Sequence, residues 1–322
     1  MKKIKIDSSE EDKSTIDVIS WILYMGNHQI ERINNKLYLP ENGIYLSPQK
    51  LNKTPKLNEE NIHKYWYRRG SIILSEMKLN YFDCTNFIKL IDTDSKNIQE
   101  FYNYALGKFN HINTPNDNNI NRLYVYEVAN KLNIQFPNTW IGNILSECPF
   151  LFKTKNIKFL IKSLNFPYLS VRHKEYLCHL SSPSILIDEN LLKSKKLPKK
   201  FFHSFFQQYI EKKYEIRSFY LKGIFKSMAI FSQQDTKTQT DFRNYNEERP
   251  NRCIPYMLPK IFEKKLQKLM QLLNINCGSI DILVTPNDEF YFLEVNPIGQ
   301  FQWLSKNCNY FIEQMIAKDL VN

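Results

Sequence analysis

The chain has 322 residues, of which 43% are hydrophobic and 24% are charged. This composition excludes a disordered chain and predicts a globular protein with several packed layers. No stretch approaches the roughly 20 apolar residues of a membrane-spanning helix, and the N-terminus becomes polar before a signal-type apolar segment develops. We therefore expect a cytoplasmic protein without a membrane partner.

The charge balance favours an anionic partner. Lys and Arg number 44 against 33 Asp and Glu, which gives a net charge of +11. Apart from residues 193–200, the basic residues are dispersed. The extended basic arm of many nucleic-acid-binding proteins is therefore missing, and we expect no nucleic-acid partner. The six cysteines form no CxxC pair and no zinc-type spacing, which indicates reduced thiols.

Residues 1–105 predict an N-terminal α/β domain with a segment suited to peptide recognition. Its predicted elements are a helix over 16–23, strands at 36–39 and 43–46, and a loop over 47–61. Within 65–70, three aromatic residues adjoin two arginines. Tyr67, Arg68 and Arg69 could grip an extended acidic peptide by stacking and bidentate pairing. The same pattern also fits a half-buried strand with solvated arginines.

Two further domains are predicted. The Asn-, Pro- and Asp-rich stretch 103–121 marks a boundary, which gives a central subdomain over 106–200 and a C-terminal subdomain over 201–322. The central elements are a helix over 122–132, a strand after the turn at 134–140, a strand at 158–162 and a basic loop over 193–200. The C-terminal elements are a hairpin of strands 216–221 and 224–232, a helix over 260–273, and a hairpin of strands 279–284 and 290–295.

The last hairpin carries two acids among apolar neighbours. Asp281 interrupts its first strand and Glu294 interrupts its second. If the strands pair antiparallel, both carboxylates can lie on one face, with Asn296 two residues further along the same face. Three oxygen donors of this kind suit Mg²⁺, which neutralises charge on a phosphoryl group. The alternative is a pair of edge-strand acids that face water.

The same residues carry a family resemblance. Asp281, followed by residues 294–297 and 299–301, resembles the closing motif of ATP-grasp ligases. More narrowly, it resembles the graspetide (microviridin-type) synthetases, and most of all the grasp-with-spasm peptide maturases. The resemblance is dense over 201–310 and loose over 110–200. In the N-terminal domain it depends mainly on the opening helix and on 65–70. Its further matching segments are 208–212, 215–217, 227–233, 241–245 and 251–256.

The resemblance implies an ATP-grasp fold of the α/β (α+β) class, with a C-terminal antiparallel sheet, and implies ATP and Mg²⁺ as cofactors. Positions matching Gln208, Tyr209 and Ile210 hold the adenine in the family, and the acid matching Glu215 binds the ribose hydroxyls. A carboxylate is well suited to accept two hydroxyl protons. Lys162 matches the lysine that reaches the nucleotide phosphates.

The resemblance also implies catalytic cations. Lys212 and Arg217 match groups near the phosphates or the acyl phosphate. Arg243 matches an arginine that engages the carboxylate to be activated, a planar group that a guanidinium recognises well. Arg252 is expected to contact the peptide or to anchor its loop.

Two features depart from the family pattern. No glycine occurs between Gly142 and Gly223, so residues 174–184 are the only candidate for the loop that covers the phosphates. Arg122 stands where relatives often have a lysine. Neither departure affects the acids of the C-terminal hairpin.

The predicted function is therefore an ATP-dependent peptide macrocyclase. Mg-ATP would convert a Glu or Asp side chain of a precursor peptide, with a leader and an acidic core, into an acyl phosphate. A Ser or Thr hydroxyl or a Lys amine would then close an ester or amide ring. Two alternatives stay open: a ligase that adds a free amino acid to a small molecule or protein tail, and a non-catalytic module that binds peptides or nucleic acid. The sequence also leaves open a homodimer, the precursor and the ring type.

Overall fold

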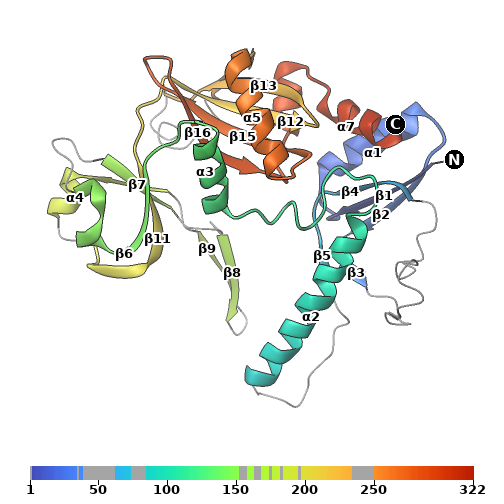
Figure 1. Ribbon diagram of the computed structural model, residues 1–322, viewed down its shortest axis with the longest axis horizontal. Helices are drawn as coiled ribbons and strands as arrows, with labels where there is room; N and C mark the ends of the chain where they lie inside the picture. The colour runs from blue at the N-terminus through green and yellow to red at the C-terminus, as the bar shows by residue number, and fades with distance from the viewer. Residues whose placement is uncertain are drawn as a thin grey trace.

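The described residues form three larger β-sheets and two short strand pairs (Figure 1). The computed structural model describes residues 2–34, 36–38, 62–73, 85–151, 158–162, 168–173, 176–181, 184–194, 197–233, 248 and 250–322. The strand predicted at 43–46 and the loop predicted at 47–61 lie outside these residues. Within them, no helix is long and apolar enough to cross a membrane.

The N-terminal sheet is parallel, in the order β2-β1-β4. Its elements are β1 (Lys3–Ser8), α1 (Lys13–Met25), β2 (Gln29–Asn34) and β4 (Ile62–Tyr67). A separate parallel pair joins β3 (Lys36–Tyr38) and β5 (Ser71–Ile73), and the long helix α2 (Thr85–Leu106) follows. Asp12 caps α1 by accepting the N–H groups of Ser14 and Thr15. The helix predicted over 16–23 is confirmed, whereas β1 and α2 were not predicted.

The central sheet is antiparallel, in the order β10-β7-β11-β6. Its strands are β6 (Thr139–Ile144), β7 (Lys158–Lys162), β10 (Ile185–Asp188) and β11 (Lys200–Gln208). Accompanying elements are the short helices η1 (Leu145–Glu147), η2 (Pro149–Leu151) and α4 (Glu189–Lys193), and the hairpin of β8 (Tyr168–His173) and β9 (Tyr176–Ser181). Phe159 and Phe206 form the centre of its core. Because β11 pairs with β6 and β7, it belongs to this sheet. The three-part division of the chain stays a prediction.

The C-terminal sheet is antiparallel throughout, in the order β14-β13-β12-β15-β16. Its strands are β12 (Tyr214–Leu221), β13 (Ile224–Phe231), β14 (Arg252–Tyr256), β15 (Cys277–Val284) and β16 (Phe290–Asn296). Both predicted hairpins are confirmed. Lys222 and Gly223 connect β12 to β13 with φ angles of 43° and 94°, and two positive φ values in a two-residue turn match the twist of the flanking strands.

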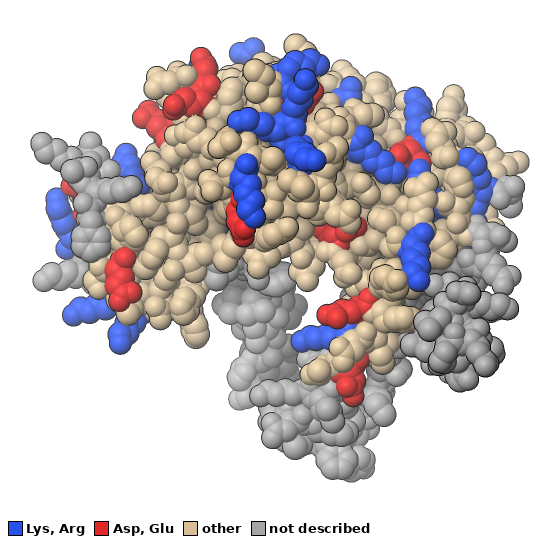
Figure 2. Space-filling view, in the orientation of Figure 1, with Lys and Arg blue, Asp and Glu red and all other residues tan. Residues whose placement is uncertain are grey.

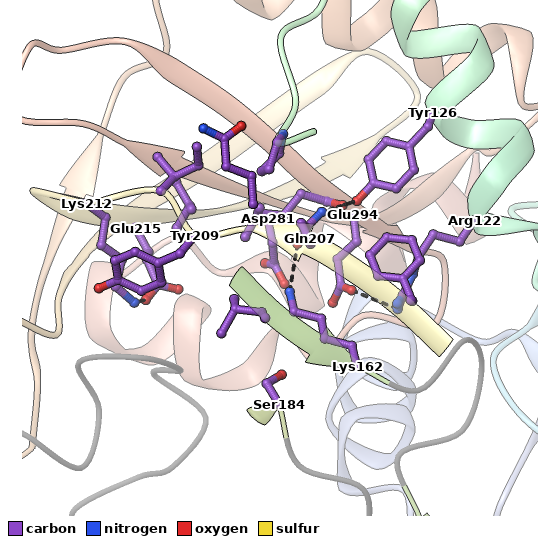
Figure 3. Close-up of a pocket in the computed structure, with 17 residues that line it drawn as sticks. Arg122, Tyr126, Lys162, Ser184, Gln207, Tyr209, Lys212, Glu215, Asp281 and Glu294 are labelled. Atoms are coloured by element: carbon purple, nitrogen blue, oxygen red, sulfur yellow. Dashed lines mark hydrogen bonds and ion pairs between the residues drawn. The ribbon is translucent and has the colours of Figure 1, made fainter. Parts of the chain in front are cut away.

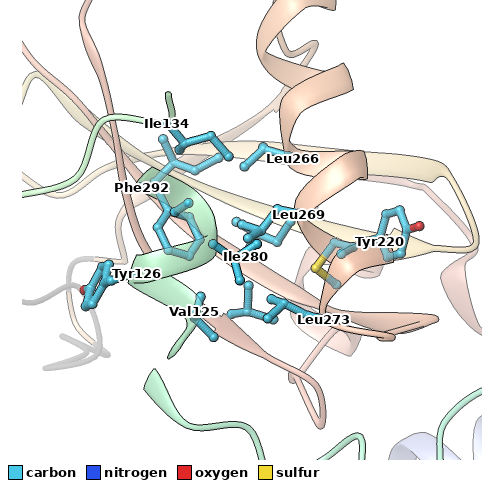
Figure 4. Packing of buried hydrophobic residues seen from close by; sticks show 14 of the residues in the cluster. Val125, Tyr126, Ile134, Tyr220, Leu266, Leu269, Leu273, Ile280 and Phe292 are labelled. Carbon is cyan, nitrogen blue, oxygen red and sulfur yellow. The ribbon is translucent and has the colours of Figure 1, made fainter. Parts of the chain in front are cut away.

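Helices cover one face of this sheet. The helices α3 (Arg122–Lys131) and α5 (Lys260–Leu272) pack on it, and Figure 4 shows Leu266 and Leu269 of α5 beside Ile280 and Phe292 of the sheet. Side chains of this cluster are almost entirely removed from water. Their burial stabilises the sheet by roughly 2 kcal/mol for each large apolar side chain.

The opposite face is divided between two environments. At one end Phe219 and Met228 join a core shared by the N-terminal sheet and the helices α6 (Gln302–Cys308) and α7 (Ile312–Val321). There α1 and α7 lie side by side, near both chain termini (Figure 1). At the other end the same face presents Glu215 and Asp281 to a pocket. The acidic residues of the pocket therefore lie on the same sheet face as an apolar core.

Candidate active site

A pocket lies between the central and C-terminal sheets, with α3 on its border. Figure 3 shows Tyr209, Lys212 and Glu215 toward one end and Arg122, Tyr126 and Glu294 toward the other, with Asp281 and Lys162 between them. The predicted catalytic residue Lys212 lines this pocket, together with seven residues predicted to bind the nucleotide or the metal: Lys162, Gln208, Tyr209, Ile210, Glu215, Asp281 and Glu294. Residues separated by more than 130 positions in the sequence thus meet in one place.

The two acids face each other because β16 contains a bulge. Asp281 lies directly opposite Glu294, but Ile282 lies opposite Phe292, so Leu293 is the extra residue. The bulge lets Phe292 face the core while Glu294 faces the pocket. Residues that are directly opposite in an antiparallel pair have Cβ atoms about 5 Å apart. The two carboxylates can therefore bind one cation together.

Each acid also has an arginine partner. Arg217 lies opposite Asp281 on the neighbouring strand, and its Nη1 donates to both carboxylate oxygens at 2.8 Å. Arg122, at the start of α3, donates from Nη2 to Glu294 at 3.1 Å. Arg217 and Asp281 are each 7% exposed, whereas the side chains of Arg122 and Glu294 are 29% and 23% exposed. The two ion pairs offset the negative charges of the two acids.

The donor set fits a divalent cation. Asp281 and Glu294 supply hard carboxylate oxygens from adjacent strands, the type of ligand that Mg²⁺ prefers. Asn296 lies opposite Ser279, is exposed, and does not line the pocket. Its Oδ1 accepts the N–H of Gly299 at 3.0 Å, and a second lone pair stays available. No group of three His, Cys, Asp or Glu side chains with metal-binding geometry occurs among the described residues.

Glu215 occupies the other end of the pocket on β12. It is 5% exposed, forms an ion pair with Lys212 and accepts a hydrogen bond from the Ser232 hydroxyl at 3.1 Å. A buried carboxylate needs such partners, because removing it from water without them would be costly. Lys212 is 6% exposed, so this pair is shielded from solvent screening.

A chain of hydrogen bonds positions Lys162. Its Nζ donates to Gln207 Oε1 at 2.9 Å, Gln207 Nε2 donates to the Tyr126 hydroxyl at 3.0 Å, and Tyr126 donates to the carbonyl of Leu293 at 2.6 Å. The network thus links β7, β11, α3 and the bulge of β16. Burial raises the pKa of Tyr126 to about 12, so its hydroxyl keeps its proton and donates. Gln207 is 1% exposed, so its amide is shielded from water inside this network.

The end of β11 and the connection that follows it supply the residues predicted to hold adenine. The N–H of Gln208 donates to the carbonyl of Asn138 at 2.8 Å, and the N–H of Tyr209 donates to the carbonyl of Lys158 at 3.3 Å. These bonds fix the segment to β7 and to the start of β6. Ile210, Tyr209 and Gln208 all border the pocket, where they could contact a ligand.

The residues predicted to bind peptide lie elsewhere. Arg68 is 4% exposed and pairs with Asp12, and Arg69, with a side chain 38% exposed, pairs with the same carboxylate at 2.9 Å. Tyr67 donates its hydroxyl to the carbonyl of Gly70 at 2.6 Å. Arg252 is exposed at the start of β14, with its guanidinium 5.7 Å from the centre of a phenylalanine ring. Arg243 lies outside the described residues. The peptide contacts of these residues stay predictions.

Three polar pocket residues outside the segment 174–184 were not assigned to the site from the sequence: Arg122, Tyr126 and Gln207. Arg122 was noted only because relatives often have a lysine there. Tyr126 and Gln207 gave no sequence signal, since each acts through a partner on a different element. Of the candidate phosphate-covering segment 174–184, residues 176–181 form β9 and Ser184 lines the pocket, while the rest lies outside the described residues.

Comparison with known proteins identifies the fold. No family model matches the chain, and no curated protein sequence matches it. An ATP-grasp ligase associated with RiPPs from Chryseobacterium gregarium, solved with ADP and a leader and core peptide, is 23% identical to this chain. Its TM-score is 0.74, and the match covers 99% of this chain and 95% of that one. The macrocyclase MdnC from Microcystis aeruginosa, bound with precursor peptide MdnA, is 24% identical with a TM-score of 0.72, covering 99% of both chains.

A third structure is more distant. The D-alanine–D-alanine ligase from Bacillus anthracis is 12% identical with a TM-score of 0.52, covering 99% of this chain and 95% of that one. The chain therefore has the ATP-grasp fold, as the resemblance implied. Its fold is more similar to the two peptide-bound ligases than to this small-molecule ligase.

Proposed function

We propose that this chain is an ATP-dependent ligase that activates Glu or Asp side chains of a ribosomally made precursor peptide and forms intramolecular esters or amides. The observation that carries the proposal is the pocket, which gathers Lys162, Glu215 and the facing acids Asp281 and Glu294 on an ATP-grasp fold. The two similar ligases solved with precursor peptides support the choice of substrate. The reaction would take place in the cytoplasm, where ATP is available.

The positions of the residues suggest how the nucleotide lies. Adenine would contact residues 208–210, the ribose hydroxyls would bind Glu215, and the phosphates would extend toward Lys162. Mg²⁺ would be held by Asp281 and Glu294, with Asn296 as a third ligand, and would neutralise charge on the transferred phosphoryl group.

The peptide carboxylate would attack the γ-phosphorus as ADP leaves, which gives an acyl phosphate. A hydroxyl or amine of the same peptide would then attack the acyl carbon, lose its proton and release inorganic phosphate. Lys212, Arg217 and Arg243 would stabilise the negative charge that develops on the transferred group. No covalent enzyme intermediate is needed, because positioning and electrostatic stabilisation supply the rate.

The basic surface fits an acidic peptide. On the face shown in Figure 2, Lys and Arg outnumber Asp and Glu, and the densest basic group lies where Figure 1 places α5. That helix contains Lys260, Lys264, Lys265 and Lys268. An excess of positive charge would raise the encounter rate with an acidic core peptide, and the effect would decline with salt.

Mass spectrometry tests the proposal. The enzyme would be incubated with ATP, Mg²⁺ and a synthetic peptide that carries Thr- and Glu-rich repeats. Loss of one water per ring, together with ADP release, is the expected result. Gain of an amino-acid residue from a supplied amino acid would instead favour the ligase that extends a small molecule or protein tail. No nucleotide turnover with any acidic peptide, and identical behaviour of the Asp281→Ala and Glu294→Ala variants, would indicate a non-catalytic binding module.

A further inference from the structure

Arg68 connects the N-terminal sheet to the loop that follows the metal-site strand. It comes directly after β4 and is 4% exposed. Its Nη1 donates to the carbonyl of Gly299 at 3.2 Å, and its guanidinium lies 5.1 Å from the centre of the Phe301 ring. Its Nε donates to the hydroxyl of Ser14 at 3.2 Å. One buried side chain thus joins the start of α1 to residues 299–301.

Asp12 holds the guanidinium in this position. The carboxylate caps α1 through one oxygen and pairs with Arg68 Nε through the other, at 3.3 Å. Burial lowers the pKa of Arg68 to about 10, which keeps it charged at neutral pH. The ion pair and the helix cap restrict Arg68 to a single direction, toward Gly299.

Gly299 in turn contacts the predicted metal ligand. Its N–H donates to Asn296 Oδ1 at 3.0 Å and to the Asn296 carbonyl at 3.1 Å. A Cβ at Gly299 would collide with the side chain of Ser279 and lie 2.8 Å from its backbone nitrogen. Ser279 is two residues from Asp281 on β15. The turn therefore packs tightly against the metal-site strands, and its N–H sets the direction of the Asn296 side chain.

We propose that Arg68 is a positioning residue for the metal site: by holding the Gly299 carbonyl, it fixes the turn that orients the Asn296 oxygen. The inference depends on the proposed function, because Asn296 acts here as a Mg²⁺ ligand. It assigns to Arg68 a role different from the peptide contact predicted from the sequence, and it makes the N-terminal sheet part of the metal site. Hydrogen-bonded groups behind a metal ligand affect affinity because they fix the ligand's orientation.

A metal-binding measurement tests this role independently of turnover. Mn²⁺ would replace Mg²⁺, and its affinity for the enzyme–ADP complex would be measured by electron paramagnetic resonance. We expect Arg68→Met to weaken Mn²⁺ binding about tenfold and to leave ADP affinity without metal within about twofold. Arg68→Lys keeps a positive charge opposite Asp12, so this variant should fold. It lacks the forked guanidinium that reaches Gly299, so its Mn²⁺ affinity should also be lower than that of wild type. It serves as the test if Arg68→Met is unfolded. Arg32→Met is the matched control, because Arg32 also donates to a backbone carbonyl, that of Ser9, at 2.7 Å.

A double-mutant cycle separates positioning from general stability. If Arg68 acts through Asn296, then Arg68→Met should change Mn²⁺ affinity less than about twofold in an Asn296→Ala background. Equal losses in both backgrounds, or unchanged Mn²⁺ affinity in both Arg68 variants, would overturn the inference. The proposed function fails separately, if the wild-type ADP complex does not bind Mn²⁺ or if Asp281→Asn binds it as well as wild type does.

Discussion

In the described part of the chain, two arginine–aspartate pairs are buried in very different places. Arg217 and Asp281 are both 7% exposed, and Arg68 and Asp12 are 4% and 8% exposed. Asp281 borders a pocket and faces Glu294, so its carboxylate can contact a ligand as well as Arg217. Asp12 caps a helix and pairs with Arg68 and Arg69, and it does not line that pocket. Burial of an ion pair therefore does not by itself identify a reactive site. The neighbouring pocket and the facing acid are what distinguish the Arg217–Asp281 pair.

The largest expected effect comes from the pocket pair. Asp281→Asn removes a predicted metal ligand, and we expect ATP-dependent turnover of a peptide to fall at least about 100-fold, since even groups behind a ligand cost 10- to 100-fold. The change also leaves Arg217 without its counter-charge, which should lower the free energy of unfolding by about 3 kcal/mol. ADP release and urea unfolding measure the two effects. Turnover within a few-fold of wild type would contradict the role of Asp281.

The second pair, Arg68 and Asp12, should contribute to the free energy of unfolding. Asp12→Asn removes the buried partner of Arg68 and Arg69, and we expect the free energy of unfolding to fall by about 3 kcal/mol. Urea unfolding at neutral pH measures it. An unfolding midpoint equal to that of wild type would show that the pair does not stabilise the fold.

The same pair should respond to acid. Burial alone would raise the pKa of Asp12, but Arg68, the hydrogen bond from Ser14, and Arg69 together hold this pKa below its usual value. A lowered folded-state pKa gives stability that is present above about pH 4 and lost as the pH falls through the folded-state value. The stability difference between wild type and Asp12→Asn should therefore shrink as the pH falls below about 4. A difference that stays constant as the pH falls would exclude Asp12 as its source.

A smaller effect is expected at the network that positions Lys162. Tyr126→Phe deletes the hydroxyl that donates to Leu293 and accepts from Gln207. Two buried polar groups lose their partner, so we expect a loss of about 1 to 2 kcal/mol in unfolding free energy and a higher KM for ATP. Tyr124→Phe on the same helix is the matched control, because Tyr124 is 51% exposed. Equal values of KM in both variants would exclude the network from nucleotide binding.

The smallest effect on stability is expected at Arg69, whose side chain is 38% exposed. Arg69→Ala should cost less than about 1 kcal/mol, as for most exposed ion pairs. If Arg69 grips the peptide, the KM for peptide should rise while the KM for ATP stays constant. Unchanged values of both would favour the alternative of a solvated arginine. Steady-state kinetics with varied peptide and varied ATP distinguish the two.

Local patterns predicted most of the C-terminal sheet. The apolar spacing of α5, the hairpin turn at Lys222 and the acids of the last hairpin are all signals carried by neighbouring residues. β1 was not predicted although Ile4 and Ile6 alternate with lysines. α2 was not predicted either. The nucleotide end of the pocket was anticipated through family resemblance rather than through spacing.

The bulge in β16 is a feature that the local sequence pattern did not predict. With a five-residue turn and regular pairing, Asp281 would face Leu293, and Glu294 would lie on the opposite face of the sheet. The extra residue in β16 brings Glu294 opposite Asp281 instead. Nothing in the strand sequence specifies that bulge, because it depends on packing Phe292 against the covered face. The burial of Arg68 is equally non-local, since its partner Gly299 is 231 residues away.

Calorimetric titration of ADP with and without Mg²⁺ tests the central claim most directly. In wild type, Mg²⁺ should raise ADP affinity at least about tenfold, and in the Asp281→Asn/Glu294→Gln double variant the metal should have no effect. ADP affinity that is independent of Mg²⁺ in wild type, or equally dependent on it in the double variant, would contradict a metal site formed by the two facing acids.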